Sequence, residues 1–368
     1  MASDGAGNLF VADSDSTIRK LVIATGAVTT LAGSLYNLGS NDGAGAAASF
    51  SFPSGVASDG EGNLFVADSS NSTIRQVVIT TAAVTTLAGS PDKQFSSGTG
   101  DGTGAAAWFA SPQGVASDGA GNLFVADDWR STIRKVVVAT GAVTTLAGSR
   151  DTGIDDSTSS PGNFHGNDGT GSAARFLQLS GITSDGAGNL FVADENCIRK
   201  IVIATAAVTT FAGDPGWAGR ADGTGTVARF YAPAGLTSDG AGNLFVADSG
   251  SSTIRKIAIA TEIVTTLAGS PENPGSADGT GAAALFDHPL GVALDGAGNL
   301  FVADTGNSTI RKIVLATGAV TTVVGSHGHT GVVLGPLPAG LSGPKDLIFG
   351  STKELFILDE NAVLVAHF

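Results

Sequence analysis

Asn63-Leu64-Phe65-Val66-Ala67-Asp68 is the hexapeptide that decides how this chain folds. The same six residues occur six times in the 368-residue sequence, and a degenerate seventh copy runs from Glu354 to Asp359. Successive copies start between 54 and 67 residues apart. The intact copies start at Asn8, Asn63, Asn122, Asn189, Asn243 and Asn299. A period of this length predicts an array of one repeated structural unit.

The hexapeptide has the pattern of a strand that is buried on both faces. In the first copy, four consecutive apolar residues lie between polar neighbours. Side chains alternate along a strand, so Leu9 and Val11 point to one face while Phe10 and Ala12 point to the other. A short continuous apolar run is typical of a strand with a packed layer on each side. Radially arranged sheets supply two such layers.

The unit around the hexapeptide is predicted to form four antiparallel strands joined by turns that contain glycine. In the second copy these strands are Gly55–Asp59, Asn63–Asp68, Thr73 to about Thr80, and Val84–Ala88. A four-stranded meander repeated at this spacing predicts an all-β propeller, with a single domain over residues 1–368. Seven central strands predict seven four-stranded blades, of which the last has three strands because the sequence ends at Phe368. A ring of six blades is the alternative.

The segment from Pro53 to Arg75 resembles the NHL repeat. It carries the pattern Pro-x-Gly-Val-Ala-x-Asp-x-x-Gly-Asn-Leu-Phe-Val-Ala-Asp-x-x-Asn-x-x-Ile-Arg, with Gln76 where the family often has Lys. Five copies have Ser-Thr before the Ile, in place of the family's His-Arg. The resemblance covers essentially the whole chain and implies a β-propeller. For function it implies a range of roles: protein-binding scaffolds, RNA binders, sensor domains and, more rarely, lyases or hydrolases.

The charge balance and the cysteine count bear on several classes of function. The formal net charge is −14, with 19 Lys and Arg against 33 Asp and Glu, which disfavours a nucleic-acid partner because an acidic body repels phosphate. Cys197 is the single cysteine, so no disulfide can form within the chain. No apolar run reaches the roughly 18 residues of a spanning helix, and no membrane partner is predicted. The first residues lack the pattern of a signal peptide, and secreted and cytoplasmic locations both stay open.

Polar residues that recur in every unit are predicted to be structural. An Asp ends each hexapeptide and an Arg follows in the next strand, which favours bracing by charge-assisted hydrogen bonds over catalysis, because catalysis needs one asymmetric site. The recurring Asp-Gly-Ala-Gly-Asn predicts a hairpin turn. Asp-Gly-Thr-Gly-Ala-Ala predicts a short helical turn, followed by a Phe that fills the gap between blades. Among the five histidines only His327 and His329 lie close together, and no metal or other cofactor is predicted.

Positions that break the repeat are the candidates for a ligand site, since any site built from repeated residues would occur six times. In a propeller, the links between blades and the loops between second and third strands open on the same face, so these residues are expected to share it. Trp and Arg are also enriched at binding hot spots. The candidates, next to the Arg150–Gln178 insertion, are Trp108, Asp128, Trp129, Arg130, Glu195, Trp217, Arg220 and Tyr231. For Trp108 packing between blades is the alternative, whereas Trp129 and Arg130 are expected to be loop residues that contribute little to stability.

These patterns predict a non-catalytic binding module that recognises a protein or a carbohydrate on the loop-bearing face. One alternative is a metal-dependent lyase or hydrolase with its site at the mouth of the channel. Another is a structural repeat module of a longer protein. The exposed third strand expected in the last blade also predicts self-association through that edge.

Overall fold

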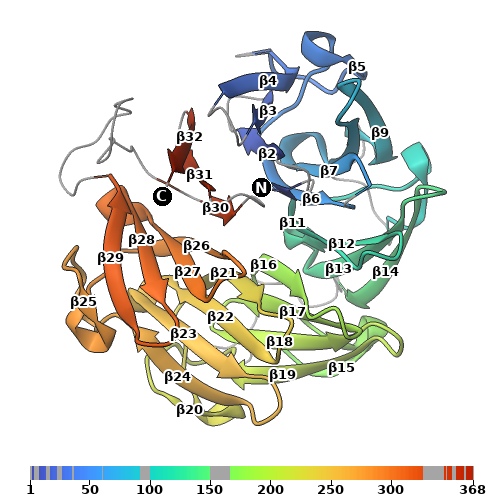
Figure 1. Ribbon diagram of the computed structural model, residues 1–368. Coiled ribbons are helices and arrows are strands. Elements are labelled where there is room, and N and C mark those ends of the chain that lie inside the picture. Colours follow the sequence, from blue (N-terminus) through green and yellow to red (C-terminus); the bar gives the residue numbers. More distant parts are fainter. Residues whose placement is uncertain are drawn as a thin grey trace.

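The computed structural model describes most of the chain as sheets arranged around a central axis (Figure 1). The described residues are 2–3, 8–13, 17–22, 27–34, 37–59, 61–91, 100–149, 166–325, 344, 346–349, 354–359 and 362–367. Apart from single 3₁₀ turns, every regular element among them is a strand. The predicted all-β propeller is therefore confirmed.

Five sheets share one topology, in which a two-residue strand from the linker joins the outer edge of a four-stranded meander. With the two-residue strand first, they are β5 (Gly43–Ala44), β6 (Pro53–Ser58), β7 (Asn63–Asp68), β8 (Thr73–Val78) and β9 (Ala83–Gly89); β10 (Gly102–Thr103), β11 (Pro112–Ser117), β12 (Asn122–Asp127), β13 (Thr132–Val137) and β14 (Ala142–Gly148); β15 (Gly169–Thr170), β16 (Leu179–Ser184), β17 (Asn189–Asp194), β18 (Cys197–Val202) and β19 (Ala207–Gly213); β20 (Gly223–Thr224), β21 (Pro233–Ser238), β22 (Asn243–Asp248), β23 (Thr253–Ala258) and β24 (Ile263–Ala268); and β25 (Gly279–Thr280), β26 (Pro289–Leu294), β27 (Asn299–Asp304), β28 (Thr309–Val314) and β29 (Ala319–Val324).

Single 3₁₀ turns occur at two places in the unit. One follows each two-residue strand: η1 (Gly45–Ala47), η4 (Gly104–Ala106), η6 (Gly171–Ala173), η7 (Gly225–Val227) and η9 (Gly281–Ala283). The other forms the loop between the second and third long strands: η2 (Ser69–Asn71), η5 (Asp128–Arg130), η8 (Ser249–Ser251) and η10 (Thr305–Asn307). The helical turn predicted after Asp101, Asp168, Asp222 and Asp278 is thus confirmed, and η1 shows that the second unit has the same turn after Asp42.

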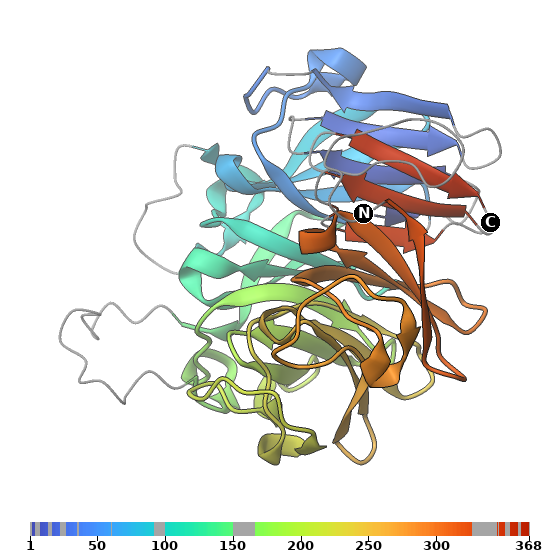
Figure 2. The same ribbon diagram turned by 90° about the vertical axis from the view of Figure 1, so that its left-hand side faces the viewer.

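The two ends of the chain form smaller sheets. The first contains β1 (Ala2–Ser3), β2 (Asn8–Asp13), β3 (Thr17–Val22) and β4 (Ala27–Gly33), and the last contains β30 (Asp346–Phe349), β31 (Glu354–Asp359) and β32 (Ala362–His367). β1 pairs with β2, and the described part of the last sheet has three strands, with β32 at its edge. The last sheet lies beside the first (Figures 1 and 2), where β31 and β32 contact β2.

The prediction of seven four-stranded blades is wrong in its strand count. Five sheets have five strands, one has four and one has three among the described residues. The extra strand arises because the linker folds back along the outer edge, where Gly223 pairs with Val264 and Thr224 with Ile263. Two residues are too few to give a periodic pattern, so hydrophobic alternation does not reveal this strand.

The central hexapeptide is buried between two neighbouring interfaces, as its pattern predicts. In β7, Leu64 and Val66 pack in one apolar cluster together with Ile18 of the preceding sheet. Phe65 and Ala67 pack in a different cluster, which includes Leu123 of the following sheet. Burial of one Leu or Phe side chain stabilises a fold by about 1.5–3 kcal/mol. The repeated hexapeptides therefore hold each sheet to both of its neighbours.

The innermost strands of successive sheets approach one another closely around the axis. β6, β11, β16, β21, β26 and β30 follow one another in this order, and β1 contacts both β6 and β30 (Figure 1). A Cβ at Gly181 in β16 would lie 2.5 Å from the carbonyl oxygen of Ala234 in β21. A Cβ at Gly235 would likewise lie 2.4 Å from the oxygen of Leu290. The third residue of the Pro-x-Gly pattern is glycine because the next inner strand occupies the space of a side chain.

The described part of the chain contains no helix with the length and apolar character needed to cross a membrane.

Replacement of Gly181 by alanine is expected to lower the free energy of unfolding by about 3 kcal/mol, because the new Cβ meets backbone that cannot move without separating two inner strands. Gly186→Ala is the matched control. Gly186 has φ = 70° but no atom within 4 Å of its Cβ position, so only backbone strain of about 1 kcal/mol is expected. Urea denaturation of both variants measures the difference. Equal losses would show that the inner strands tolerate a side chain.

Candidate functional site

A buried arginine fixes the linker to each of the five complete sheets. Arg255 in β23 donates through Nη1 to Asp248 Oδ2 at 3.0 Å and through Nη2 to Asp222 Oδ1 at 2.7 Å. It also donates to two linker carbonyl oxygens, and its guanidinium lies 5.0 Å from the ring centroid of Phe230. Asp248 is fully buried, whereas the Asp222 side chain is half exposed. We call this unit, one Arg with two Asp, the arginine clamp.

The same arrangement recurs in the other complete sheets and confirms the structural role predicted for the repeated Asp and Arg. Each guanidinium is fully buried and stacks on a linker phenylalanine that packs between sheets. The equivalent arginines are Arg75, Arg134, Arg199 and Arg311. In all five clamps the linker Asp also accepts a hydrogen bond from a threonine of the outer strand, such as Thr266 in β24. Four segments of the unit therefore meet at one guanidinium.

The third unit departs from this plan through a stacked pair that was predicted to face a ligand. The Arg130 guanidinium lies 3.5 Å from the ring centroid of Trp108, and both side chains are buried. Arg130 replaces Asn71 and Asn307, which donate to the clamp aspartate in their own units. The expectation that Arg130 is a loop residue of little importance for stability is therefore corrected. A buried cation stacked on an indole is part of the packing between linker and loop.

The loop-bearing face is the side of the ring where the linkers meet the loops between second and third strands. In four units the backbone N–H of the middle residue of the loop 3₁₀ turn donates to the carbonyl oxygen of the linker residue two positions before the innermost strand, whereas in the fourth unit Glu195 donates to the oxygen of Gln178. We call the two paired residues of the four units the linker position and the loop position. They are Ser51 and Ser70, Ala110 and Trp129, Tyr231 and Gly250, and Asp287 and Gly306. The paired positions of these four units lie beside the ends of the innermost strands, and we call this part of the loop-bearing face, around the central axis, the channel mouth.

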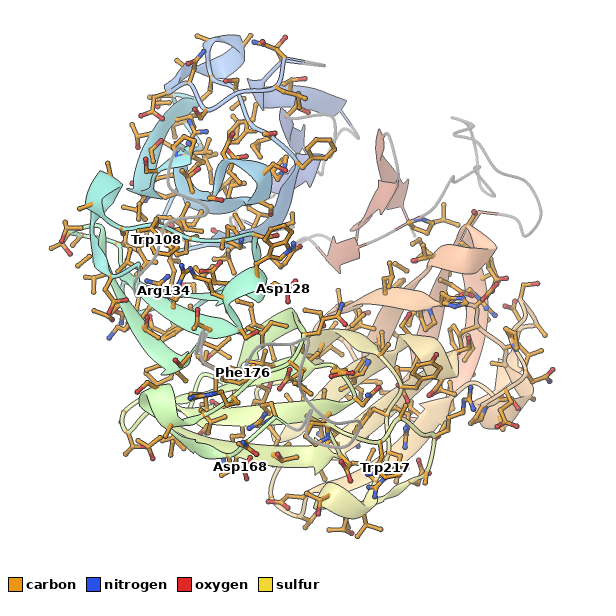
Figure 3. All side chains as sticks on the ribbon, turned by 180° about the vertical axis from the view of Figure 1, so that it is seen from behind. Trp108, Asp128, Arg134, Asp168, Phe176 and Trp217 are labelled. Atoms are coloured by element: carbon orange, nitrogen blue, oxygen red, sulfur yellow. The ribbon has the colours of Figure 1, made fainter. Side chains whose placement is uncertain are left out.

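The predicted ligand-binding residues occupy two zones of this face. Four of them adjoin the channel mouth: Asp128, Trp129, Glu195 and Tyr231. Figure 3 shows Asp128 toward the centre of the ring. Trp217 follows β19 and lies at the rim in the same figure, with 68% of its surface exposed. The structure therefore does not bring the three tryptophans together.

Arg220 contacts Tyr231 within one linker and Glu272 of the next linker. The Arg220 guanidinium lies 5.7 Å from the Tyr231 ring centroid and donates to Glu272 at 3.0 Å. Glu272 belongs to the next linker, so this exposed pair spans neighbouring sheets.

Two acidic candidates in adjacent sheets differ in their environment. Asp128 accepts a hydrogen bond from the backbone N–H of Leu179 in the next sheet, and burial raises the pKa of its carboxyl group. Glu195 is exposed and has φ = 50°, and its partial desolvation raises the pKa of its carboxyl group. The positions that follow the clamp aspartate in other sheets carry Ser69, Ser249 or Thr305. The third and fourth sheets are thus the acidic part of the mouth.

Sequence reasoning missed Phe52, Asp287 and His288 at the same mouth. Phe52 is 56% exposed, with φ = 48°, directly before the innermost strand β6. His288 holds the equivalent place before β26, and its Nδ1 lies 2.6 Å from Asp287 Oδ1. A comparison of the residue before each Pro-x-Gly pattern would have singled out Phe52 and His288.

Parts of the prediction fall on residues that are not described. The described residues do not include most of the Arg150–Gln178 insertion. They also exclude three histidines, His165, His327 and His329. Within the described ranges, no group of three or more His, Cys, Asp and Glu side chains is placed to hold a metal ion.

Comparison with known proteins agrees with the architecture. The NHL repeat model matches residues 50–77 and 286–313. The chain is 30% identical over 308 residues to NHL repeat-containing protein 2 of Gallus gallus, covering 75% of this chain and 41% of that protein. The chain belongs to the NHL-repeat β-propeller family. It is also 29% identical over 331 residues to SUPPRESSOR OF QUENCHING 1, a chloroplastic protein of Arabidopsis thaliana, covering 86% of this chain and 30% of that protein.

This NHL-repeat chain therefore spans well under half the length of the curated relatives it matches. Among solved structures, a streptogramin B lyase aligns with a TM-score of 0.62 at 10% identity, over 99% of this chain and 91% of that chain. This likeness shows the fold alone.

Replacement of Arg255 by lysine is expected to lower the free energy of unfolding by about 3–5 kcal/mol, because an ammonium cannot replace a planar fork and the buried Asp248 loses its partner. Arg220→Lys is the control. Its pair with Glu272 is exposed to solvent, and a change below about 1 kcal/mol is expected. Chemical denaturation compares the two. A loss at Arg255 no greater than that at Arg220 would contradict the clamp.

Two sets of aspartates give the stability of the protein opposite pH dependences. Burial raises the pKa of clamp aspartates from 3.8 to about 6 in Asp194 and Asp304 and to about 7 in Asp127, against the opposing effect of the arginines. In the hairpin turns, burial acts to raise the pKa of Asp118, but hydrogen bonds from the Asn122 side chain and from the backbone lower it on balance. The same turn bonds occur at Asp59, Asp185, Asp239 and Asp295.

The melting temperature is therefore expected to be highest in mildly acidic solution. Clamp aspartates have a higher pKa when folded, so the folded state binds more protons and stability rises as pH falls from about 7 to 4. Turn aspartates have a lower pKa when folded, so their contribution is lost as pH falls below 3.8. Differential scanning calorimetry between pH 3 and 8 tests the profile. The acidic rise should persist in high salt, which screens surface repulsion but not buried groups. A melting temperature that is highest at pH 8 would contradict it.

Proposed function

We propose that this propeller is a non-catalytic binding module that recognises a protein or a carbohydrate on its loop-bearing face. One observation carries the proposal. Repeated polar side chains in the described units are used in clamps and turns, whereas the paired positions at the channel mouth carry different side chains in the four units where they occur. A conserved framework with interchangeable exposed residues is what selective recognition requires, since identical units cannot distinguish one ligand from another.

The exposed residues at the mouth are of the types that contribute most to binding. Trp129 is 61% exposed and Tyr231 is 44% exposed, and both belong to paired positions. Large aromatic side chains are enriched at binding hot spots because they bury much area with few rotatable bonds. Each of them would contribute about 1–2 kcal/mol when covered by a ligand.

A proteome pull-down and a glycan array, each run with the wild-type chain and with Trp129→Ala/Tyr231→Ala, test this function. A specific ligand should be retained by the wild type and lost by the double variant at an unchanged melting temperature. Trp217→Ala is the matched control, because it removes an exposed indole at the rim. Retention that is equal for all three proteins would refute binding at the mouth. Turnover of a retained small molecule would establish an enzyme instead.

A further inference from the structure

Space at the paired positions admits one large side chain for each sheet. A Cβ at Gly250 would lie 2.7 Å from Cγ of Tyr231, and a Cβ at Gly306 would lie 2.6 Å from Cγ of Asp287. In the third unit the order is reversed, because the loop position carries Trp129 and the linker position carries Ala110. In these three units the two positions are therefore alternatives. Each of the three presents one large side chain, supplied either from the linker or from the loop.

The side chains presented in this way combine aromatic rings and carboxylates. Trp129 and Tyr231 are the aromatic residues, with Phe52 at the neighbouring place in the second sheet. Asp287 occupies the paired position in the sixth unit, and Asp128 and Glu195 adjoin the mouth in the third and fourth. An aromatic face and a carboxylate both attract cations.

Several arginines in the described part of the surrounding face lie beside carboxylates. Each clamp places one guanidinium against two carboxylates, and the guanidinium is the fully buried member. Arg220 pairs with Glu272, and Arg229 lies 3.5 Å from Asp214. The formal net charge of the whole chain is −14. Electrostatic complementarity therefore favours a basic partner, in both encounter rate and specificity.

We propose that the channel mouth binds an extended basic peptide segment of a partner protein, with Lys or Arg side chains held by Trp129, Asp128, Glu195 and Asp287, beside Tyr231, whose ring contacts Arg220. The proposal rests on the binding function proposed above and narrows it to one class of ligand. Because these residues come from the third, fourth, fifth and sixth sheets, successive parts of the peptide are read by neighbouring sheets. A neutral sugar would use the rings but not the carboxylates, and so fits this set of side chains less well.

The alternation of the paired positions is tested without any ligand. Ala110→Tyr alone is expected to lower the melting temperature by several degrees, because two large side chains then compete for one space. Adding Trp129→Gly copies the arrangement of Tyr231 and Gly250 into the third sheet and should restore most of the loss. If the single variant is as stable as the wild type, or if the double variant does not recover, the alternation is wrong.

Fluorescence anisotropy with a labelled decapeptide of alternating Lys and Gly tests the partner. The peptide should bind the full chain and weaken with added salt, while its lysine-acetylated form should not bind. Trp129→Ala should weaken binding about tenfold, the effect of one lost cation–π contact. Trp217→Ala should leave it unchanged, and Ala110→Tyr/Trp129→Gly should keep it within a few-fold.

Failure of the basic-peptide assignment can be told apart from failure of the binding function. Binding of the acetylated peptide with equal affinity, or equal weakening by Trp217→Ala, overturns the basic-peptide assignment. If the glycan array gives a ligand that depends on Trp129 while the lysine peptide does not bind, the assignment fails and the binding function stands. If no protein or glycan is retained through Trp129 and Tyr231, both fail.

Discussion

A fully buried guanidinium that satisfies two aspartates and the linker carbonyls is the interaction on which the rest of this propeller depends. The linker contains glycine and small residues and would not hold one path by its own packing. Arg255 fixes that path by binding Asp222 and stacking on Phe230, which in turn fills the space between two sheets. The short outer strand, the 3₁₀ turn and the paired positions all lie in the segments that this contact positions.

The clamp also explains why the loop-bearing face can vary. Its guanidinium and the hexapeptide aspartate are buried and only the linker aspartate is half exposed, so the exposed ends of linker and loop are not needed for the path of the backbone. Backbone bonds, such as that from Gly250 N–H to the oxygen of Tyr231, keep these ends together whichever side chains they carry. The third sheet carries Trp108 and Arg130 where other sheets have different residues, and it still keeps its clamp. The clamp is thus compatible with different side chains around it.

Features with a local period could be predicted from the sequence. The two-faced burial of Leu64 and Phe65, the hairpin turns and the bracing role of Arg255 each follow from residues that are close in sequence or repeated. The fifth strand could not be predicted, because two residues carry no period and their pairing depends on a linker already held by Asp222. The stacking of Arg130 on Trp108 depends on two segments about twenty residues apart. The candidate site was therefore found in outline, while the alternation at its paired positions needed the structure.

The clamp joins only residues of one unit, from Asp222 in the linker to Thr266 in the outer strand, 44 positions later. A stretch of gene that encodes one unit therefore encodes all the residues of its arginine clamp. Duplication of that stretch adds a sheet without compensating changes elsewhere. The near-identity of the copies is what recent or repeated duplication would leave. A scaffold that enlarges in this way gains an additional presenting position with each copy, free to diverge from the moment it appears.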